Sequence, residues 1–382
     1  MILFLAIYFL VYGGVHVYFF LKLVRAFSFS APGQWGLGVF LVVMVLIPIA
    51  VHFLERIGQE RAACLASWSG YLWMGALFFA FCLFLIVDVW NWSTRIGTAV
   101  TGFDRSAWMI GARSAALLAL GGAVLLSVYS AWEATRLRTE RIVFPSAKVS
   151  QPTRIVQISD VHVGFIIDTD CIGRIVAAVE AARPDLVVST GDLVDGQIDS
   201  LAGPMQRLRD LKPRLGKYAV TGNHEFYAGL EQALAFTEGA GFTVLRGEGR
   251  AVGGVLNLAG VDDATGIQAG LAPAVDERAI LSGLDNRLFT ILLRHRPDAR
   301  SETAGLFDLQ LSGHTHKGQI FPFSLLVGMA FPHLAGDYRL PNGGLLHVSR
   351  GTGTWGPPMR FLAPPEITVI DLVPGPGQGG TK

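Results

Sequence analysis

The sequence predicts a membrane-anchored α/β protein, with four N-terminal transmembrane helices and a C-terminal sandwich of two packed β-sheets flanked by helices. Hydrophobic residues make up 51% of the 382 residues, which is above the usual share for a globular protein. This excess lies in the first 132 residues. Beyond residue 150, short apolar runs alternate with amphipathic stretches, and most Asp, Glu and His residues lie there. Composition therefore divides the chain into a membrane part and a polar part.

This division predicts four segments along the chain. Residues 1–132 are expected to form the transmembrane domain, and residues 152–373 the α/β domain. Between them, residues 133–151 are expected to be a basic linker, because "TRLRTER" carries three arginines. Residues 374–382 are rich in glycine and proline and are expected to be a flexible tail.

Four long stretches that are nearly free of charge predict the transmembrane helices. They lie near residues 2–21, 37–54, 68–88 and 112–132. About 20 apolar residues are needed for a helix to cross a bilayer, and a helix pairs its own backbone polar groups. Tryptophans near the ends of these stretches fit the membrane interface; they are Trp68, Trp73, Trp90, Trp92, Trp108 and Trp132.

Three ionisable residues lie in or beside these stretches, namely His16, His52 and Asp88. Ionisable residues within a membrane are often functional. However, His52 and Asp88 lie near the ends of their segments, where they can reach the lipid headgroups. The sequence therefore predicts structural roles and no transport path.

The composition also bounds the location and the partners. The chain is expected to be a multi-pass protein of the cell membrane, in contact with the lipid bilayer. The arginines that follow the last helix favour the cytoplasmic side for the α/β domain, and they are also suited to contact anionic headgroups. A net charge of only +1 argues against nucleic-acid binding. The sequence predicts no particular oligomeric state.

The elements of the α/β domain follow from the spacing of apolar residues. "TRIVQISD" predicts a buried strand, and "DCIGRIVAAVEAARPD" predicts a helix. "DLVVSTGD" and "KYAVTGNHE" are strands that alternate with further helices, so parallel strands with right-handed crossovers are expected. The later strands are more closely spaced and predict a second sheet packed on the first; they are "FTVLRG", "VLNLAGVDD", "FTILLRHRPD", "DLQLSGHTH", "LLHVSRG" and "EITVIDL".

Polar residues gather where the predicted strands end. Residues two apart on an extended chain point to the same face, and sites in open α/β sheets form beyond the carboxyl ends of the strands. We therefore expect these side chains to lie close together. They are Asp160 and His162, Asp192 and Asp195, Asn223 and His224, His295, and His314 and His316.

The mixture of carboxylate, imidazole and amide groups predicts a metal site. Such ligands suit divalent ions such as Mn, Fe or Zn, whereas ligation by oxygen alone favours Mg or Ca. Even seven ligands drawn from these nine residues are too many for one ion and fit two, which can clamp the attacking and leaving oxygens of an in-line displacement. The alternative for any single histidine is a hydrogen-bonded core residue.

The order of these blocks resembles a known family. Asp-x-His, Gly-Asp, Gly-Asn-His-Glu, His and Gly-His-x-His, in this order, resemble the calcineurin-like metallophosphoesterase superfamily over residues ~150–372. The blocks "GHTHKGQIFP", "VSRGTGTWGPPMRF" and "PPEITVIDL" further resemble its membrane-associated bacterial phosphodiesterase branch. The resemblance implies the metallophosphoesterase form of the two-sheet fold for the second domain.

The resemblance also implies a role for each residue. Asp160, His162 and His316 would hold a first ion, Asn223, His295 and His314 a second, and Asp192 would bridge both. A hydroxide between the ions would attack phosphorus, since a bound ion lowers the pKa of its water. His224 would protonate the leaving oxygen, and Asp195 would orient His224. Glu225 is expected to make structural hydrogen bonds, whereas Asp262 and Asp263 either cap a loop or contact substrate.

One position departs from the phosphatase pattern. Gly196 follows Asp195 where protein phosphatases of the superfamily have an arginine. An arginine that would grip a terminal phosphate dianion is therefore missing, which favours a diester or a pyrophosphate over a phosphoprotein. Lys317, Arg350 and Arg360 are alternative sources of positive charge, or are structural cations.

The apolar run "IFPFSLLVGMAFPHLAG", within residues 320–336, has two interpretations. It is too short and too interrupted by proline to cross a membrane. It is either a buried core segment or an interfacial loop that dips into lipid beside the site.

Together these features predict a membrane-anchored two-metal phosphodiesterase that acts on a lipid or envelope phosphoester. One alternative is a phosphomonoesterase or nucleotide pyrophosphatase of the same fold. Another is a non-catalytic membrane regulatory module, against which the intact set of ligands argues.

Overall fold

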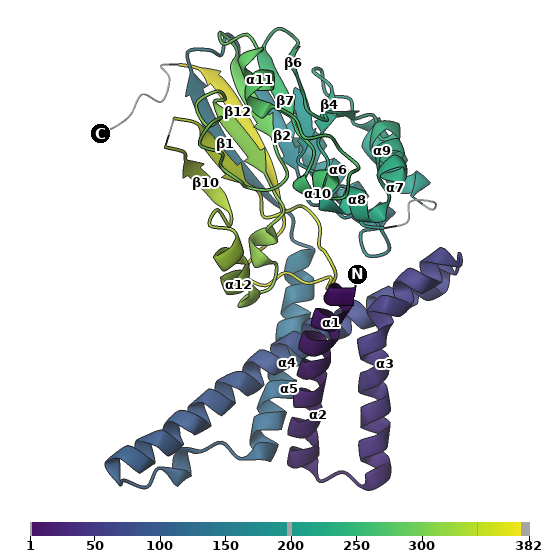
Figure 1. The fold of residues 1–382 in the computed structure, drawn as a ribbon, viewed down its shortest axis with the longest axis vertical. Coiled ribbons are helices and arrows are strands. Elements are labelled where there is room, and N and C mark those ends of the chain that lie inside the picture. Colours follow the sequence, from purple (N-terminus) through teal and green to yellow (C-terminus); the bar gives the residue numbers. More distant parts are fainter. Residues whose placement is uncertain (1, 197–200, 342, 376–382) are drawn as a thin grey trace. The chain divides into compact units, whose positions relative to one another are not determined.

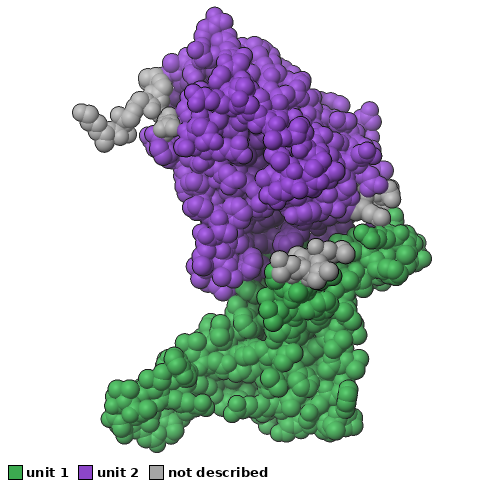
Figure 2. Space-filling view, viewed as in Figure 1, with its two compact units in different colours: residues 1–132, 356–359 green, residues 133–355, 360–382 purple. Residues whose placement is uncertain are grey.

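The computed structural model describes residues 2–196, 201–341 and 343–375. The chain divides into two compact units (Figure 2). Residues 1–132 and 356–359 form the first unit, and residues 133–355 and 360–382 form the second. The short segment Gly356–Met359 thus belongs with the helices, although the chain on both sides of it belongs to the second unit.

The first unit is helical (Figure 1). Its elements are α1 (Ile2–Tyr8), the π-helical turn η1 (Phe9–Gly13), α2 (Gly14–Phe27), α3 (Ala31–Arg56), α4 (Glu60–Thr101), the 3₁₀ turn η2 (Ser106–Trp108) and α5 (Ala112–Ala134). Four helical stretches are long and apolar enough to cross a membrane, namely Leu5–Phe27, Ala31–Arg56, Glu60–Thr101 and Ser106–Ala134. The prediction of four apolar helices is confirmed, and they indicate association with a membrane.

The helices are longer than the predicted segments. α3 begins at Ala31 instead of near residue 37, and α4 has 42 residues where the sequence predicted 68–88. Apolar composition marks only the part of a helix that suits lipid. The helix itself continues to a residue that adopts a non-helical backbone. In α4 that residue is Gly102, whose backbone is left-handed at φ +69°, a conformation that glycine adopts readily.

The ionisable residues within the helices have partners inside the first unit. The carboxylate of Asp88 accepts a hydrogen bond from Tyr18 Oη at 2.6 Å and pairs with Lys22. His16 Nε2 accepts a hydrogen bond from Trp73 Nε1 at 2.9 Å. These contacts agree with the structural roles that the sequence predicted for His16 and Asp88.

The second unit contains two six-stranded sheets (Figure 1). The first has the order β1-β12-β2-β3-β4-β5, and its strands are β1 (Arg138–Ser146), β12 (Glu366–Pro374), β2 (Thr153–Ile158), β3 (Leu186–Ser189), β4 (Lys217–Ala219) and β5 (Thr243–Val244). The second has the order β10-β11-β9-β8-β7-β6, and its strands are β10 (Gly336–Arg339), β11 (Leu345–Val348), β9 (Leu309–Ser312), β8 (Phe289–Leu293), β7 (Leu256–Gly260) and β6 (Glu248–Val252). Strands β2, β3 and β4 are parallel, as are β7, β8 and β9.

Alternation along the strands builds a layered core. Ile155 in β2 points into a cluster that also contains Leu258 and Ile291 of the second sheet, so the two sheets pack face to face. The next residue, Val156, points to the opposite face, which is covered by α6 (Thr169–Ala182), α7 (Ala202–Asp210) and α9 (Leu230–Gly239). On the outer face of the second sheet, Leu292 packs with Leu281 of α11 (Glu277–Ser282). The predicted sandwich flanked by helices is confirmed.

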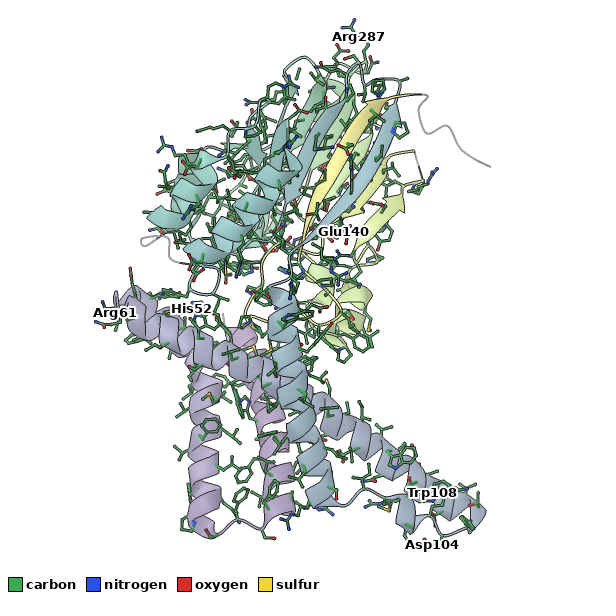
Figure 3. All side chains as sticks on the ribbon, turned by 180° about the vertical axis from the view of Figure 1, so that it is seen from behind. His52, Arg61, Asp104, Trp108, Glu140 and Arg287 are labelled. Atoms are coloured by element: carbon green, nitrogen blue, oxygen red, sulfur yellow. The ribbon has the colours of Figure 1, made fainter. Side chains whose placement is uncertain are left out.

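The prediction of a linker at residues 133–151 was wrong for its central part. Residues 138–146 form β1, which pairs in parallel with β12 at the edge of the first sheet. The exposed Arg141 and Val143 alternate here with the more buried Ile142 and Phe144, as in an edge strand with one solvated face. Glu140, labelled in Figure 3, lies on this strand and its carboxylate is 2.5 Å from Arg350 Nη2. At the other end, β12 reaches Pro374, and residues 376–382 of the predicted tail lie outside the described residues.

Candidate metal centre

The predicted ligands follow the carboxyl ends of five parallel strands. Asp160 and His162 follow β2, Asp192 follows β3, and Asn223 begins α8 (Asn223–Ala228) just after β4. In the second sheet, one histidine follows β8 and two follow β9; these are His295, His314 and His316. The structure brings all seven side chains into one continuous cluster.

The first group of ligand atoms comes from both sheets. Asp160, His162 and His316 each offer an atom within 4.8 Å of the others. The Nε2 atoms of the two histidines are 3.1 Å apart, and His316 Nε2 is 3.5 Å from Asp160 Oδ1. All three residues are buried, so the sequence prediction that they share one spot is matched by the geometry.

The second group is equally compact. His295 Nε2 lies 3.1 Å from His314 Nδ1, 3.2 Å from Asn223 Oδ1 and 3.2 Å from Asp192 Oδ2. His295 Nδ1 is 2.8 Å from the carbonyl oxygen of Thr190. Because a carbonyl oxygen only accepts, Nδ1 carries a proton. Burial alone would lower the pKa of His295, but the Asp192 carboxylate raises it to about 10, so a cation in this group would take the place of the proton on Nε2.

Asp192 stands between the two groups. The same atom, Asp192 Oδ2, is 3.2 Å from His295 Nε2 and 3.9 Å from His162 Nε2. Burial opposes its charge, but the neighbouring His295 and His224 rings hold the pKa of the Asp192 carboxyl well below its usual range. The carboxylate is therefore charged and placed to be shared.

The donor set fits a pair of divalent cations. Two ligands at right angles, each about 2.1 Å from one ion, lie about 3.0 Å apart, close to the nitrogen–nitrogen separations of 3.1 Å in both groups. Burial and the charge of Asp192 raise the pKa of Asp160, so two buried carboxylates repel one another here. Cations between them would relieve that repulsion.

The backbone around the ligands is strained in one shared way. Five of the seven ligand positions have φ between +49° and +70°, in the left-handed region that costs about 1–2 kcal/mol for a residue with a side chain. These are Asp160, His162, Asp192, His314 and His316. Strain of this kind concentrates at functional sites.

Two glycines allow the ligand carboxylates to approach other loops. A Cβ atom on Gly222 would lie 2.1 Å from Asp192 Oδ1, and one on Gly313 would lie 2.1 Å from Asp160 Oδ2. Any side chain at either position would displace a carboxylate. These glycines are therefore part of the cradle.

Glu225 connects two of the loops that carry the ligands. Its buried carboxylate accepts hydrogen bonds from the backbone N–H groups of Asp192 at 3.0 Å, Leu193 at 2.7 Å and Gly222 at 2.6 Å. A charged acceptor on several amides is a strong contact. The expected structural role of Glu225 is confirmed by these hydrogen bonds.

His224 and Asp195 lie beside the ligands as a pair. His224 Nδ1 is 2.6 Å from Asp195 Oδ1, and the same oxygen is 3.4 Å from His162 Nδ1. Burial alone would lower the pKa of His224, but the carboxylates of Asp192 and Asp195 raise it to about 9. His224 thus holds a proton at neutral pH, whereas cations at Asp192 would lower its pKa again.

Two of the three candidate cations have structural partners. Arg350 pairs with Glu140 and Glu366, in both cases at 2.5 Å. Arg360 is fully buried, and it donates to the carbonyl oxygens of Arg350 and Ala363. Lys317 is half-buried and forms no ion pair with any described residue.

Arg360 also touches a ligand. Its Nη2 is 3.0 Å from His316 Nδ1, and its Nη1 donates to the His316 carbonyl oxygen at 3.2 Å. Burial and this arginine hold the pKa of His316 well below its usual range, so the ring is neutral. A guanidinium only donates, so the neutral His316 ring accepts at Nδ1 and carries its proton on Nε2. An ion bound at Nε2 would require the tautomer with the proton on Nδ1.

The two aspartates left open by the sequence have structural partners. Asp262 accepts hydrogen bonds from Thr221 and Arg246. Asp263 caps α10 (Ala264–Gln268) and pairs with Arg296. The loop-capping interpretation therefore holds for Asp263.

Three aromatic residues near the histidines escaped the sequence analysis. The rings of Tyr227 and Trp355 lie 5.5 and 5.6 Å from the His224 ring, and the Phe331 ring lies 4.9 Å from the His314 ring. They come from distant parts of the chain. Trp355 lies in a block quoted for the family resemblance and Phe331 in the apolar run within residues 320–336, whereas Tyr227 lies in neither.

Comparison with known proteins agrees with this geometry. The family model described as calcineurin-like phosphoesterase matches residues 153–318, a range that includes all seven ligands. An uncharacterized metallophosphoesterase of Aquifex aeolicus (strain VF5) is 40% identical over 253 residues, which are 65% of this chain and 97% of the relative.

Two further relatives match the chain to different extents. An uncharacterized metallophosphoesterase of Campylobacter jejuni is 29% identical over 378 residues, which are 95% of this chain and 96% of the relative. A protein of Danio rerio described as a transmembrane protein with metallophosphoesterase domain is 35% identical over 233 residues, which are 57% of this chain and 53% of the relative.

Proposed function

Because the chain belongs to the calcineurin-like metallophosphoesterase family, we propose that it is a membrane-anchored phosphodiesterase that uses two divalent metal ions. The observation that carries the proposal is the shared Asp192 Oδ2 atom between two compact groups of ligand atoms. One carboxylate common to two groups suits a pair of ions that act on the same phosphate.

Each residue of the cluster has a place in this proposal. Asp160, His162 and His316 would hold one ion, and Asn223, His295 and His314 the other, with Asp192 shared. Mn, Fe or Zn suits these nitrogen and oxygen ligands. When bound, the ions would polarise the phosphoryl oxygens and lower the pKa of water, so that hydroxide is available to attack phosphorus.

The proton for the leaving oxygen would come from His224. Asp195 accepts at His224 Nδ1, so the opposite nitrogen, Nε2, is free to donate. Water adds to phosphorus, the bond from phosphorus to the leaving oxygen breaks, and His224 protonates that oxygen. The products are an alcohol and a phosphate monoester.

The surroundings of the cluster support a diester as substrate. A monoester dianion has one more charge than a diester and needs additional cations. Gly196 stands where related phosphatases place an arginine, and the guanidinium groups of Arg350 and Arg360 are already engaged. Lys317 is then the remaining candidate for contact with phosphate among the three cations considered.

We also propose that the four apolar helices hold the second unit at the cytoplasmic face of the cell membrane. Arginines cluster directly after α5, at Arg136, Arg138 and Arg141, and basic residues next to a span favour the cytoplasmic side. A substrate carried by the membrane, such as a lipid or envelope phosphoester, would then be concentrated near the site.

Metal removal tests the proposal. The full-length protein in detergent should hydrolyse ethyl p-nitrophenyl phosphate after loading with Mn²⁺, lose the activity on treatment with a chelator, and regain it when Mn²⁺ is restored. The diester should be hydrolysed at least ~10-fold faster than p-nitrophenyl phosphate, a difference of about 1.4 kcal/mol. Faster hydrolysis of the monoester would favour a phosphomonoesterase, and no hydrolysis of either compound by metal-loaded protein would refute the proposal.

A further inference from the structure

The second unit carries one helix with an exposed apolar surface. α12 (Phe323–Ala330) has the sequence FSLLVGMA and contains no charged residue. The exposed fractions of Leu325, Leu326 and Met329 are 63%, 61% and 84%. Large apolar side chains that cluster on a surface mark a contact site for a partner or a membrane. The interpretation of this run as a buried core segment was therefore wrong for α12.

The apolar surface continues from α12 to the metal centre. Phe331 follows the helix, and its backbone N–H donates to the carbonyl oxygen of Val327 at 2.8 Å. The Phe331 ring stands edge-on to the His314 ring, with 4.9 Å between the ring centroids. Just beyond, Thr315 Oγ1 donates to the Leu334 carbonyl oxygen at 2.6 Å. The chain thus leads directly from the exposed leucines of α12 to an aromatic ring that contacts a ligand of the second group.

Aromatic rings border the other side of the centre. Tyr227 and Trp355 contact the His224 ring, and their exposed fractions are 68% and 53%. Such rings, with one polar atom on a large apolar body, are favoured at the boundary between lipid and water. The centre is therefore bordered by apolar and aromatic groups near both His224 and His314.

The chain itself indicates what covers this surface. Three residues separate the end of α5 at Ala134 from the start of β1 at Arg138, and three extended residues span about 10 Å. The α/β unit is therefore tethered closely to a helix that is long and apolar enough to cross a membrane. A lipid bilayer is the apolar phase that this tether makes available.

We propose that α12 and Phe331 form a lipid-binding surface that lies in the membrane interface and holds the acyl chains of the substrate. The substrate class is then a phosphodiester with acyl chains, whose phosphate reaches the metal centre while its chains stay against α12. This inference rests on the proposed phosphodiesterase function and adds the acyl chains, a part of the substrate that the metal ligands do not contact. An amphipathic surface of this kind binds through buried apolar area.

A matched pair of substrates tests the proposal. Dioleoylglyceryl p-nitrophenyl phosphate in phosphatidylglycerol vesicles and soluble ethyl p-nitrophenyl phosphate share the leaving group and differ in the acyl chains. The triple variant Leu325→Gln, Leu326→Gln, Met329→Gln is compared in full-length protein with the control Val143→Gln, Leu271→Gln. Both control residues are exposed apolar residues elsewhere in the second unit, at 50% and 49%.

The triple variant should hydrolyse the lipid at least ~10-fold more slowly and the soluble diester within about twofold of the original rate, while the control should change neither. Unchanged lipid hydrolysis, or equal losses on both substrates, would overturn the lipid-binding role. If the original protein hydrolyses only the soluble diester, the substrate class is wrong and the phosphodiesterase proposal stands. If it hydrolyses neither with metal loaded, the proposed function itself fails.

A measurement that needs no activity tests the surface alone. Benzoyl-phenylalanine placed at Met329 in full-length protein, reconstituted in the same vesicles, should form covalent adducts with phospholipid on illumination. The same group at Val143 should form few or none. Adducts that are absent at position 329, or equally frequent at both positions, would show that α12 does not lie in lipid.

Discussion

The two sheets of the second unit contribute different chemistry to the same centre. The first sheet supplies the oxygen ligands Asp160, Asp192 and Asn223 together with His162, and the second supplies only the imidazoles His295, His314 and His316. The negative charge that attracts cations thus comes from one sheet. Three of the four imidazoles, whose nitrogens select the kind of ion, come from the other.

This difference indicates that ions would join the two sheets. Both groups of ligand atoms described above contain residues that follow strands of the two sheets, so a bound ion would add to the backbone hydrogen bonds that already join the sheets here, such as Gly353 N–H to the Asp160 carbonyl oxygen. Removing a carboxylate ligand that follows the first sheet changes the charge of the centre, whereas removing a histidine that follows the second sheet removes a nitrogen donor. Substitution of a carboxylate that follows the first sheet and of a histidine that follows the second should therefore change metal content and activity to different extents.

The largest effect is expected at Asp192. The change Asp192→Asn keeps the shape of the side chain but removes the charge shared by both groups, so both ions should bind weakly. Hydrolysis of ethyl p-nitrophenyl phosphate should fall about 1,000-fold, or about 4 kcal/mol in transition-state stabilisation, and elemental analysis should find less than one ion per chain. Asp308→Asn is the control, because Asp308 lies just before β9 and binds Lys148. A variant that retains two ions would contradict the shared role.

A smaller effect is expected at His314. The change His314→Ala removes one nitrogen from the second group and leaves the first group intact. Metal content should fall from about two ions to about one per chain, and activity about 100-fold, which corresponds to about 2.7 kcal/mol. His333→Ala is the control, since that ring contacts Tyr338 and the Pro297 carbonyl oxygen. If His314→Ala loses both ions as Asp192→Asn does, the two sheets do not differ as described.

The positions of the ligands could be predicted from the sequence, because aspartate and histidine directly after apolar strands have few structural reasons to be there. The strand ends then brought the first and second sheets' ligands together as expected. Their left-handed backbone could not be predicted, since nothing in "ISDVH" or "SGHTH" demands a positive φ. It arises when several loops compete for the space around one centre.

Two other features depended on contacts between distant residues. The charges in β1 predict a linker, and only pairing with β12, more than 200 residues later, makes this segment a strand. The rings of Tyr227, Phe331 and Trp355 share the rim of the centre although they lie on three separate segments. Periodicity within a segment contains no information on such pairings.

Glu225, which lies in α8, should matter because it holds the ligand loops in position, although it is not a proposed ligand. The change Glu225→Gln keeps the size but turns an amide group towards backbone N–H donors, so at least one donor loses its acceptor. A hydrogen bond to a charged group contributes about 1.5–3 kcal/mol, so thermal unfolding of the second unit should occur at lower temperature, with activity reduced about tenfold. Glu231→Gln, at an exposed position in α9, should change neither. An unchanged unfolding temperature for Glu225→Gln would show that the clamp does not stabilise the loops.

The smallest effect, and the most selective, is expected at Asp195, which lies in the loop after β3 and is not a proposed ligand. Asp195→Asn removes the carboxylate that holds His224 Nδ1 at 2.6 Å, so His224 should be less often protonated and less well oriented. A general acid matters most when the leaving group is a poor one. Hydrolysis of a dialkyl phosphate should therefore slow about tenfold, whereas hydrolysis of ethyl p-nitrophenyl phosphate, whose leaving group needs no proton, should change less than about twofold.

Equal losses on both compounds would instead place Asp195 in support of His162 and the first ion, because its other contact is His162 Nδ1 at 3.4 Å. The ratio of the two rates thus separates proton transfer from metal binding on one side of the centre.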